Sequence, residues 1–590
     1  MKQFFKYMLA TMVGIILVNV IGFFIFIGVI AMVFAGSNKE TDAVKDKSIL
    51  VLKFDYEITE RTSSNPFDNF DFSTLESKIQ PGLNDILKNI EKATYDPNIK
   101  GIYLNVVNLN GTYGTLSEIR DKLSEFKKSG KFIIANGEFY SQRAYYLASV
   151  ADKIYLTPQG TLFFNGLSTN AVFLGSLFDK IGVDFQVFKG PNNIYKSSPD
   201  MYTNDKYSAE ASMEMQVLVN NMWNDIIKDI ALSRNISADS LNYFADNFTF
   251  FADSQLVKNK IIDGLVFKDQ VFDEIKEKIG ISKSSKINWV DLSDYYSVID
   301  SRNEYSKNKI AVVYAYGTMV PLDASEGNMS AEKISASLHG LRSDSAIGAV
   351  VLRINSGGGS SQAAEIIWRE LELLKKVKPV VVSMGDVAAS GGYYISSPAD
   401  SIFAERFTIT GSIGVFGVIP NAEELYKKIG LSTDGVKTNR YSDFLSNVNR
   451  PLNESEGLLV QKAINSVYDV FLTRVSNGRS MPYAYIDSIG RGRVWSASDA
   501  LKVGLVDTIG TLSDAVKAAA FLAGYKQYRT VDYPKVTNDW MQVFSNMQAN
   551  VEKRIEQKIV GEYIDVLNTL KQVESMDPIQ TRIPYLINVK

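Results

Sequence analysis

Short apolar runs rich in β-branched residues alternate with longer amphipathic stretches through most of the chain. Residues 348–354 read "GAVVLRI" and residues 378–384 read "KPVVVSM", and both have the near-continuous apolar character of strands buried on both faces. Between them, residues 360–377 carry apolar side chains at helical spacing and end in basic residues. A strand, a helix and a second strand joined by short links predict βαβ units and a mostly parallel sheet, so the predicted fold class is α/β.

The same pattern occurs twice in the chain. "DPNIKGIYLNV" from Asp96 matches "DSAIGAVVLRI" from Asp344, 248 residues later, and the same shift aligns "AYYLASVADKIY" from Ala144 with "GYYISSPADSIF" from Gly392. The shift holds without a gap for about ninety residues. The sequence therefore predicts two tandem copies of one domain.

The repeats set the predicted boundaries along the chain. Residues 540–573 have an apolar seam at helical spacing, which predicts an amphipathic helix that packs on the body or on a neighbouring subunit. Serine, lysine and other polar residues dominate the stretch between the repeats, as expected of a linker. The predicted divisions are an N-terminal segment at 1–46, a first repeat at 47–285, a linker at 286–304, a second repeat at 305–530 and a C-terminal helical extension at 531–590.

The N-terminal segment has a pattern of its own, an uncharged run from Tyr7 to Ala35 in which Asn19 is the only strongly polar side chain. As a helix the run would extend roughly 40 Å, more than the ~30 Å hydrocarbon core of a bilayer, so it predicts one transmembrane anchor after a short cytoplasmic stub. Lysines on both sides leave its orientation open. The alternative is a signal peptide cleaved before Gly36, but the apolar run is about twice the usual ~7 to 15 residues of such a peptide.

Composition excludes several kinds of site. The chain has no cysteine, which rules out disulfides, thiolate nucleophiles and thiolate metal ligands, and its single histidine, His339, cannot form a histidine metal cluster. A formal net charge of -3 gives no basic excess for binding nucleic acid, and the chain has no nucleic-acid-binding motif. The sequence therefore predicts no metal, no cofactor and no nucleic-acid partner.

The two copies differ where chemistry is expected. Ser390, in "GDVAASGGYYISSPAD", has Gln142 as its counterpart, so only the second copy has a hydroxyl group there. The stretch "RINSGGGSS" carries three glycines directly after a strand, whereas its counterpart "NVVNLNGTY" keeps only Gly111. Consecutive glycines let backbone N–H groups face a ligand and suit an oxyanion hole for acyl transfer, although taken alone they fit an ordinary flexible turn equally well.

A serine nucleophile needs a neighbouring base to take its proton. His339 lies at a polar helix end and is interpreted as a surface or capping residue. Asp386 and Asp400 both have acidic counterparts in the first copy, which lacks the serine, so they are interpreted as structural. The second copy therefore contains no convincing base for Ser390.

Lysine is the remaining type of base, and Ser-Lys pairs are an accepted variant of nucleophilic catalysis. Lys196, in "KGPNNIYKSSPD" of the first copy, has Phe444 as its counterpart, so one copy carries the amine and the other the hydroxyl group. The amine must be neutral to act, which requires a buried setting that lowers its pKa from ~10.4 toward neutrality. Taken alone, Lys196 is better interpreted as a solvated loop lysine than as a catalytic one. The complementarity of the two copies, together with the family resemblance given next, favours a catalytic role.

The stretches "NIYKSSPD", "RINSGGGS" and "SMGDVAASGGYYIS", in this order on a duplicated body behind an apolar N-terminal run, resemble the signal peptide peptidase A family in its long, two-domain form. The resemblance covers essentially the whole chain. It implies tandem domains with a crotonase-like fold, related to the Clp protease proteolytic subunit, and a Ser-Lys dyad divided between the repeats. Ser390 would be the nucleophile, and Lys196 would be the general base and later the general acid.

The resemblance also assigns supporting residues. Ser412, in "TITGSIGVFG", matches the family's hydroxyl group that positions the lysine. The oxyanion would be bound by backbone N–H groups of Gly358, Gly359 and Gly391. The family usually has a proline where this chain has Gly357, and the loss of proline raises the entropic cost of ordering the turn by ~0.4 to 1 kcal/mol.

The activity implied by the resemblance is hydrolysis of membrane-derived peptides, above all cleaved signal peptides. The enzyme would be a homotetramer anchored in the bacterial inner membrane, with its catalytic body on the periplasmic side. Two other classes of function stay open. One is a crotonase-like enzyme that binds coenzyme A thioesters through a similar backbone oxyanion hole. The other is a non-catalytic membrane scaffold, against which the intact serine, glycine turn and lysine argue.

Overall fold

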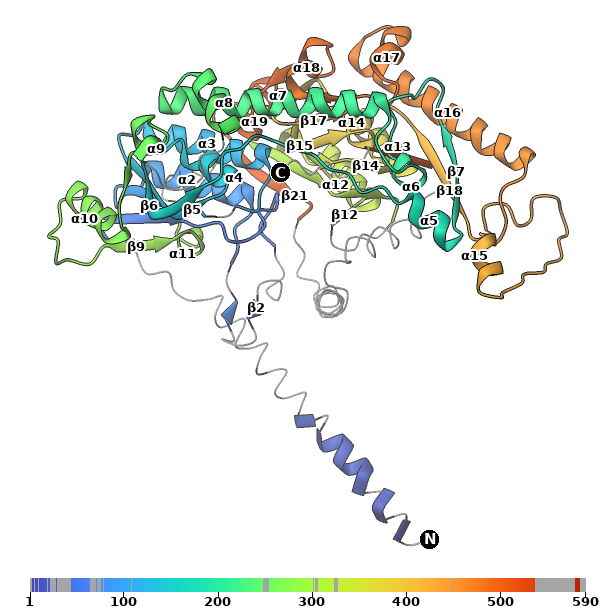
Figure 1. Cartoon of the computed structure of the whole chain (residues 1–590), viewed down its shortest axis with the longest axis horizontal. Helices are drawn as coiled ribbons and strands as arrows, with labels where there is room; N and C mark the ends of the chain where they lie inside the picture. Colours follow the sequence, from blue (N-terminus) through green and yellow to red (C-terminus); the bar gives the residue numbers. More distant parts are fainter. Residues whose placement is uncertain are drawn as a thin grey trace.

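The computed structural model arranges the body of the chain as three main sheets with helices packed around them (Figure 1). No helix among the described residues is both long and apolar enough to cross a bilayer. Much of the run predicted as an anchor lies outside those residues, so the anchor stays a prediction. The described residues are 3–4, 6–8, 10–18, 20–21, 28, 44–63, 70–71, 76–77, 79–107, 109–247, 254–300, 302, 306–322, 327–446, 448–535 and 579–583.

The first repeat is built on a parallel sheet of six strands in the order β8-β6-β5-β4-β1-β9. Successive strand residues such as Ile49 and Leu50 enter different apolar clusters, so the sheet is buried on both faces, as the near-continuous apolar runs predict. The strands are β1 (Ser48–Leu52), β4 (Ile99–Leu104), β5 (Phe132–Tyr140), β6 (Lys153–Leu162), β8 (Gly264–Leu265) and β9 (Asn288–Asp291). The helices of this repeat include α2 (Leu83–Tyr95), α3 (Tyr113–Lys127), α4 (Gln142–Ala148) and α10 (Lys268–Lys278).

The second repeat follows the same plan, with the order β19-β17-β15-β13-β10-β21, with β16 paired to β15 and with β20 paired to β16. All these pairings are parallel except that of β17 with β19, which confirms the predicted α/β class and mostly parallel sheets. The strands are β10 (Lys309–Tyr316), β13 (Ile347–Ser356), β15 (Val380–Ala389), β16 (Ser401–Ala404), β17 (Ile409–Gly411), β19 (Val494–Ser496), β20 (Thr508–Ile509) and β21 (Arg529–Tyr533). The helices are α12 (Ala331–Ser343), α13 (Ser361–Lys375), α14 (Gly391–Ser396) and α19 (Leu512–Leu522).

A third sheet joins the two repeats. Its order is β12-β11-β14-β22-β18-β7, and β7 comes from the first repeat whereas β18 comes from the second. The two strands pair antiparallel over six residues, so the first repeat adds a strand to the sheet of the second. The strands are β7 (Asp184–Lys189), β11 (Thr318–Val320), β12 (Asn328–Ser330), β14 (Gly358–Ser360), β18 (Phe416–Asn421) and β22 (Ile579–Arg582).

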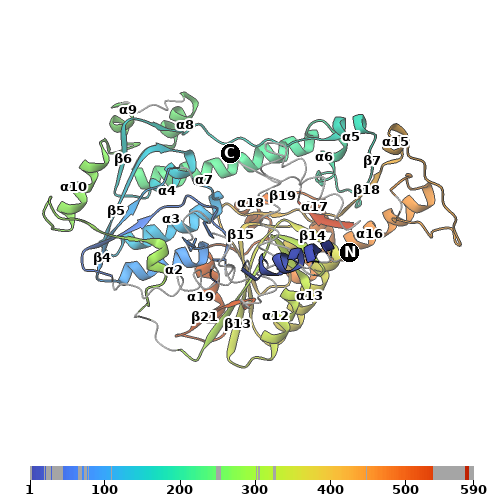
Figure 2. The same ribbon diagram turned by 90° about the horizontal axis from the view of Figure 1, so that it is seen from below.

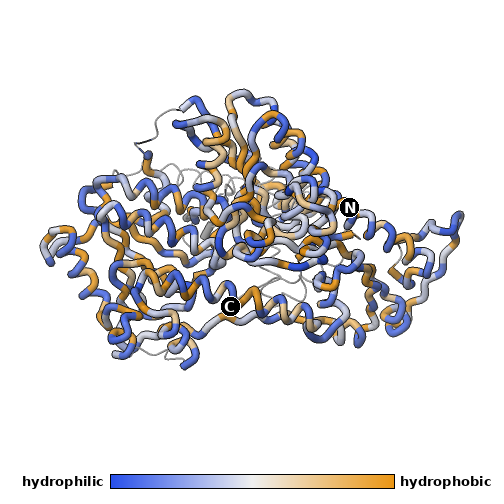
Figure 3. The backbone as a smooth tube through the Cα atoms, turned by 90° about the horizontal axis from the view of Figure 1, so that it is seen from above, coloured by the Kyte–Doolittle hydropathy of each residue, from blue (hydrophilic) through white to orange (hydrophobic). Residues whose placement is uncertain are grey.

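Two long helices add further contacts between the two repeats. Helix α7 (Ala209–Arg234) belongs to the first repeat and extends across the second, where it contacts β19, and α16 (Glu454–Arg479) of the second repeat contacts β7 (Figures 1 and 2). Both start at capping side chains, Ser208 for α7 and Asn453 for α16. Hydrophobic and hydrophilic positions alternate along the chain, including along the long helix α7 (Figure 3).

A buried ion-pair network also holds the repeats together. The Arg353 guanidinium group on β13 binds Glu60 at 3.0 Å and also pairs with Glu118, and all three side chains are almost fully buried. Beside it, Asp386 accepts hydrogen bonds from the N–H (2.9 Å) and the hydroxyl group (3.0 Å) of Thr115 in the first repeat. Asp386 therefore joins the two repeats, as its interpretation as a structural residue requires.

The structure differs from the predicted boundaries at two places. The segment predicted as a linker, 286–304, supplies β9 to the first sheet and also forms α11, because a four-residue strand is too short to stand out from a polar stretch. The strand β21 (Arg529–Tyr533) crosses the predicted start of the helical extension at residue 531, and 579–582 within the extension form a strand. Residues 536–578, which include the predicted amphipathic helix, lie outside the described residues. The remaining elements are β2 (Phe70–Asp71), β3 (Glu76–Ser77), α5 (Gly175–Ile181), α6 (Asp200–Thr203), α8 (Ala238–Asn247), α9 (Ser254–Lys258), α11 (Leu292–Tyr296), α15 (Glu423–Lys428), α17 (Tyr483–Ile489) and α18 (Ala497–Lys502).

Candidate active site

Ser390 lies where strand β15 turns sharply into helix α14. Its φ of 54° and ψ of -113° lie in a region that residues other than glycine rarely adopt, and such strain is concentrated at functional sites. The Ser390 N–H donates to the Gly411 carbonyl group at 2.8 Å, which holds the turn. A Cβ on Gly392 would lie 2.6 Å from the Ser356 carbonyl oxygen, so the helix can start this close to β13 only without a side chain there.

Lys196 reaches this turn because the first repeat has placed β7 in the sheet of the second. The pairing of β7 with β18 begins at Lys189 and Phe416, and the chain continues from Lys189 directly into the loop that carries Lys196. The loop is fixed to the second repeat by the Tyr195 N–H, which donates to the Arg491 carbonyl group at 3.1 Å. The two repeats of one chain thus bring the predicted residues together.

The Lys196 amine is in contact with both predicted hydroxyl groups. Its Nζ lies 2.9 Å from Ser390 Oγ, 2.9 Å from Ser412 Oγ and 3.3 Å from the Ser412 carbonyl oxygen. All three residues are 0% exposed. Three residues selected from separate stretches of sequence therefore form one buried hydrogen-bonded cluster.

One turn, at residues 491–493, holds both Ser412 and the loop that carries Lys196. Its N–H donates to the Arg493 carbonyl group at 2.6 Å, and its hydroxyl group lies 3.4 Å from the Gly492 carbonyl oxygen. In the first repeat the counterpart of Ser412 is Phe164, whose ring packs against Trp223 in the core. The first repeat thus has no hydroxyl group at this position.

Burial sets the protonation of the lysine. Because a charged amine loses its hydration here, burial lowers the pKa of Lys196 well below its usual value of 10.5, while the negative charge of Glu214 acts in the opposite direction. Burial also raises the pKa of the Glu214 carboxyl group to about 8. The loss of hydration on burial is therefore the main cause of both pKa shifts.

Glu214 is a site residue that the sequence did not reveal. It lies on α7 among the buried residues Ala211, Met215 and Leu218, and its Oε1 accepts a hydrogen bond from the Val494 N–H at 2.6 Å. Its Oε2 has no hydrogen-bond partner within the described part of the chain. The available signal was an acidic residue on the apolar face of an amphipathic helix. Glu214 fixes α7 to β19, directly after the turn that holds Ser412.

The glycine turn lies beside the serine. Gly358 has a φ of 94° and Gly359 a φ of 154°, which favour glycine, and a Cβ on Gly358 would lie 2.7 Å from the Gly391 nitrogen. The turn is therefore directly next to the N–H that follows Ser390. The Gly358 N–H itself donates to Ser356 Oγ at 3.1 Å.

In the first repeat the position equivalent to Ser390 is occupied by Gln142, whose side-chain amide is hydrogen-bonded through both its oxygen and its nitrogen. Gln142 Oε1 accepts hydrogen bonds from the N–H groups of Asn165 and Gly166, both at 3.0 Å. Its Nε2 donates to the Tyr113 hydroxyl group at 3.0 Å and to the Gly166 carbonyl group at 3.1 Å. The side chain ties three segments together and contains no nucleophile.

The other residues weighed from the sequence lie outside the cluster. The His339 side chain is 66% exposed and lies beside Arg342, in keeping with its interpretation as a surface residue. Asp400 Oδ2 accepts a hydrogen bond from the Val380 N–H at 2.8 Å. Asp152, its counterpart in the first repeat, makes the same bond to Ile133 at 2.8 Å, so both copies keep this aspartate for structure.

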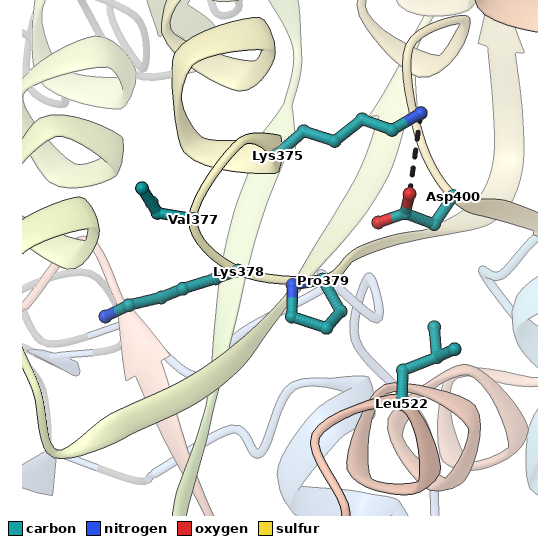
Figure 4. Close-up of a pocket in the computed structure, with 6 residues that line it drawn as sticks. All are labelled: Lys375, Val377, Lys378, Pro379, Asp400 and Leu522. Atoms are coloured by element: carbon teal, nitrogen blue, oxygen red, sulfur yellow. Dashed lines mark ion pairs between the residues drawn. The ribbon is translucent and has the colours of Figure 1, made fainter.

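A cavity of about 360 Å³ lies away from the Lys196 cluster, at the start of β15 (Figure 4). Its charged residues are already paired, since Lys375 Nζ lies 3.5 Å from Asp400 Oδ1 and donates to the Pro398 carbonyl group at 2.7 Å. The cavity therefore offers no free reactive group. In the described ranges, no three potential metal ligands come together. The lining residues are Lys375, Val377, Lys378, Pro379, Asp400 and Leu522.

The model of peptidase family S49 matches the chain twice, at residues 125–282 and 372–526. The chain belongs to peptidase family S49. It is a serine peptidase, as the sequence predicted. In this S49 chain the first matched region contains Lys196, and the second contains Ser390 and Ser412.

Relatives extend the match to most of the S49 chain. Protease 4 of Haemophilus influenzae is 33% identical over 554 residues, which are 91% of this chain and 89% of the relative. The chloroplastic serine protease SPPA of Arabidopsis thaliana is 32% identical over 453 residues, 75% of this chain and 66% of the relative. Among solved structures, ClpP1 from Listeria monocytogenes aligns over 35% of this chain and 94% of its own, with 20% identity and a TM-score of 0.23. At this TM-score the likeness adds nothing to the topology described above.

Proposed function

We propose that this chain is a membrane-anchored serine endopeptidase in which Ser390 attacks the peptide carbonyl carbon and Lys196 takes its proton. The supporting observation is the 2.9 Å distance between Lys196 Nζ and Ser390 Oγ in a cluster without solvent exposure. A nucleophile and its base must lie within hydrogen-bond reach, about 2.6 to 3.2 Å. The duplication is then part of the mechanism, because each repeat supplies one half of the pair.

The hydrogen bonds of the amine suit a general base. A neutral lysine has two N–H groups and one lone pair. Both oxygens of Ser412 lie within reach of Nζ, so they can accept the two N–H bonds and leave the lone pair for the Ser390 O–H. Ser412 would therefore act by orienting the amine.

The reaction follows from these positions. The Ser390 oxygen forms a bond to the carbonyl carbon as its proton moves to Lys196, and the carbonyl oxygen becomes the oxyanion. The ammonium group then gives its proton to the leaving amine as the C–N bond breaks, which leaves an acyl-enzyme. A water molecule repeats the sequence, with Lys196 taking its proton and returning one to Ser390.

The oxyanion would be bound by backbone N–H groups beside Ser390. We assign the first donor to Gly391 and the second to the 358–359 turn, which lies directly next to it. The Gly358 N–H can serve only if it exchanges its bond to Ser356 Oγ for the oxyanion.

The proposed setting is a bacterial inner membrane, with a single-pass anchor and the body on the periplasmic side. The uncharged run from Tyr7 to Ala35 supports the anchor, since it has the length of a membrane span. We propose that the substrates are membrane-derived peptides, above all remnants of cleaved signal peptides, and that the enzyme works as a homotetramer.

Two variants test the function. Ser390→Ala and Lys196→Ala should each abolish hydrolysis of an internally quenched peptide, while Lys502→Ala, a change at an exposed lysine, should leave the rate unchanged. Near-normal turnover by Lys196→Ala would refute the proposal that Ser390 and Lys196 form the catalytic pair. The thioester alternative predicts instead that coenzyme A esters bind and that a serine-directed acylating probe leaves no adduct on Ser390.

A further inference from the structure

Strands β13 and β15, which lead to the glycine turn and to Ser390, do not pair in one continuous register. Ile354 on β13 lies opposite Met384 on β15. Two residues further along β13, Ser356 lies opposite Ala388, which is four residues further along β15. Strand β15 therefore contains two extra residues in this interval, which makes a β-bulge. A bulge leaves hydrogen bonds of the strand pair unmade and bends the strand that contains the extra residues.

The bulge decides which residue reaches the glycine turn. The register after the bulge, continued from Ser356 and Ala388, brings Ser390 opposite Gly358. In agreement, a Cβ on Gly358 would lie 2.7 Å from the nitrogen of Gly391. Without the two extra residues Ala388 would lie opposite Gly358, and Ser390 would be about 6.6 Å further along, at ~3.3 Å per strand residue. The bulge thus places the nucleophile beside its oxyanion donors.

The side chain of Asn355 bridges the bulge. Its Oδ1 accepts a hydrogen bond at 3.2 Å from the N–H of Val387, one of the residues in the bulged part of β15. Its Nδ2 donates to Asp386 Oδ2 at 3.0 Å and to Glu60 Oε1 at 2.9 Å. The amide oxygen and both N–H groups of Asn355 therefore have partners. Asn355 joins β13 to β15 at the point where their backbone pairing is interrupted.

One of these hydrogen bonds connects the two repeats. Glu60 belongs to the first repeat and is almost fully buried. Its carboxylate also accepts from the Arg353 guanidinium group, at 3.0 Å and 3.3 Å. Arg353 and Asn355 are two residues apart on β13, so they reach the same carboxylate from one face of the strand. The first repeat thus supports the bulge in addition to supplying Lys196.

The first repeat, which has no nucleophile, lacks the bridging amide. Its strands β4 and β5 keep one register up to the pair formed by Leu104 and Ala135. The residue equivalent to Asn355 is Val107, whose side chain cannot form hydrogen bonds. The amide is therefore present only in the copy that contains Ser390.

We propose that Asn355 is a positioning residue of the peptidase, which fixes the bulge against Glu60 of the first repeat and so aligns Ser390 and the Gly391 N–H with the glycine turn. This role rests on the proposed function, in which Ser390 is the nucleophile. The amide of Asn355 is engaged within the protein and does not hold the substrate. Alignment of a nucleophile with oxyanion donors matters most in the transition state, so its loss lowers kcat and leaves KM nearly unchanged.

The test is a double-mutant cycle in the full chain, measured by steady-state peptide hydrolysis. Asn355→Asp keeps an acceptor for the Val387 N–H but replaces both N–H donors by a carboxylate beside Glu60 and Asp386. We expect kcat to fall about 10- to 100-fold, with KM changed less than about twofold. Adding Glu60→Gln restores the total charge and provides an N–H donor for the new carboxylate. The double variant should therefore recover about tenfold in kcat relative to Asn355→Asp.

Asn84→Asp is the matched control. Asn84 Nδ2 donates to Asp532 Oδ2 at 2.8 Å, which is also a bond between the repeats. Asp532 lies on β21, and β10 and β13 separate this strand from β15. The control creates a similar pair of facing carboxylates, so it should lower stability and leave kcat unchanged. A fall in kcat equal to that of Asn355→Asp would indicate a general weakening of the interface and overturn the proposal.

Unchanged kcat in Asn355→Asp, or a fall that Glu60→Gln does not reverse, would also overturn it. If Asn355→Asp does not fold, Glu60→Gln alone takes its place in the comparison. That variant should lower kcat, and the double variant should be faster; a double variant no faster than Glu60→Gln would overturn the positioning role.

Hydrogen exchange tests the bridge without any chemistry. The Val387 amide should exchange faster in Asn355→Leu, which removes the acceptor, than in Asn355→Asp, which keeps it. Equal exchange in the two variants would overturn the bridging role. Hydrolysis retained by Ser390→Ala would instead refute the proposed function. The two failures can therefore be told apart.

Discussion

Replacing Lys196 by methionine should abolish activity and yet stabilise the fold near neutral pH. Methionine has a similar length and no ionisable group, so it removes the proposed base from the cluster with Ser390 and Ser412. Loss of a general base typically costs 10²- to 10⁴-fold in rate, or about 2.7 to 5.5 kcal/mol of barrier. The loss should appear in kcat.

The stability effect follows from the lowered pKa of Lys196. Between that lowered pKa and ~10.4 the unfolded chain holds a proton on this amine that the folded chain does not, so wild-type stability rises with pH by about 1.4 kcal/mol per unit. The methionine variant lacks this dependence. Its advantage over the wild type should therefore be largest at the acid end of this window and shrink as the pH rises. The Ser390 hydroxyl group, which loses its partner, reduces the advantage by about 1 to 3 kcal/mol but does not change its slope.

Denaturant unfolding of both proteins in detergent at pH 7, 8 and 9 measures the slope. Lys502→Met is the matched control, because Lys502 is 73% exposed and has no lowered pKa. The difference in unfolding free energy between Lys502→Met and the wild type should show no such decrease of about 1.4 kcal/mol per pH unit. If the Lys196→Met difference is equally flat, the amine is charged in the folded state and cannot act as the base.

Ser412→Ala should lower kcat about 10- to 100-fold with little change in KM, because the amine loses an orienting bond of 2.9 Å; steady-state kinetics measures this. Glu214→Ala should destabilise the fold by about 1 to 3 kcal/mol in denaturant unfolding, because the Val494 N–H loses its buried acceptor, whereas Glu214→Gln keeps that acceptor and should cost less. Arg353→Met leaves two buried carboxylates unpaired and should cost about 3 to 5 kcal/mol by the same measurement. The kcat/KM of the wild type should rise with pH and level off above the lowered pKa of Lys196, because only the neutral amine accepts a proton; if kcat/KM rises only near pH 10, the amine is not buried and neutral.

The sequence was most informative where the two copies could be compared. Helices α3 and α13 begin at Tyr113 and Ser361, 248 residues apart, and the central strands keep the same order in both sheets, because near-continuous apolar runs specify strands buried on both faces. The comparison also separated residues present in one copy from those kept in both. Ser390 and Lys196 were found in this way, with the family resemblance.

Features that depend on contacts between distant segments were not predictable. The pairing of β7 with β18 joins positions more than 200 residues apart, and nothing in "DFQVFK" specifies its partner. Strand β22 is equally hidden, since a four-residue stretch becomes a strand only between two existing edges. Glu214 was missed because its significance depends on what α7 packs against.

In the proposed mechanism the Lys196 amine takes the proton of Ser390. The most direct measurement is the rate at which a serine-directed acylating probe modifies Ser390, followed by intact mass at pH 7 in the wild type, Lys196→Met and Ser390→Ala. We expect a single adduct on the wild type, none on Ser390→Ala, and a rate about 10²- to 10⁴-fold lower for Lys196→Met. Modification of Lys196→Met at the wild-type rate would contradict this mechanism.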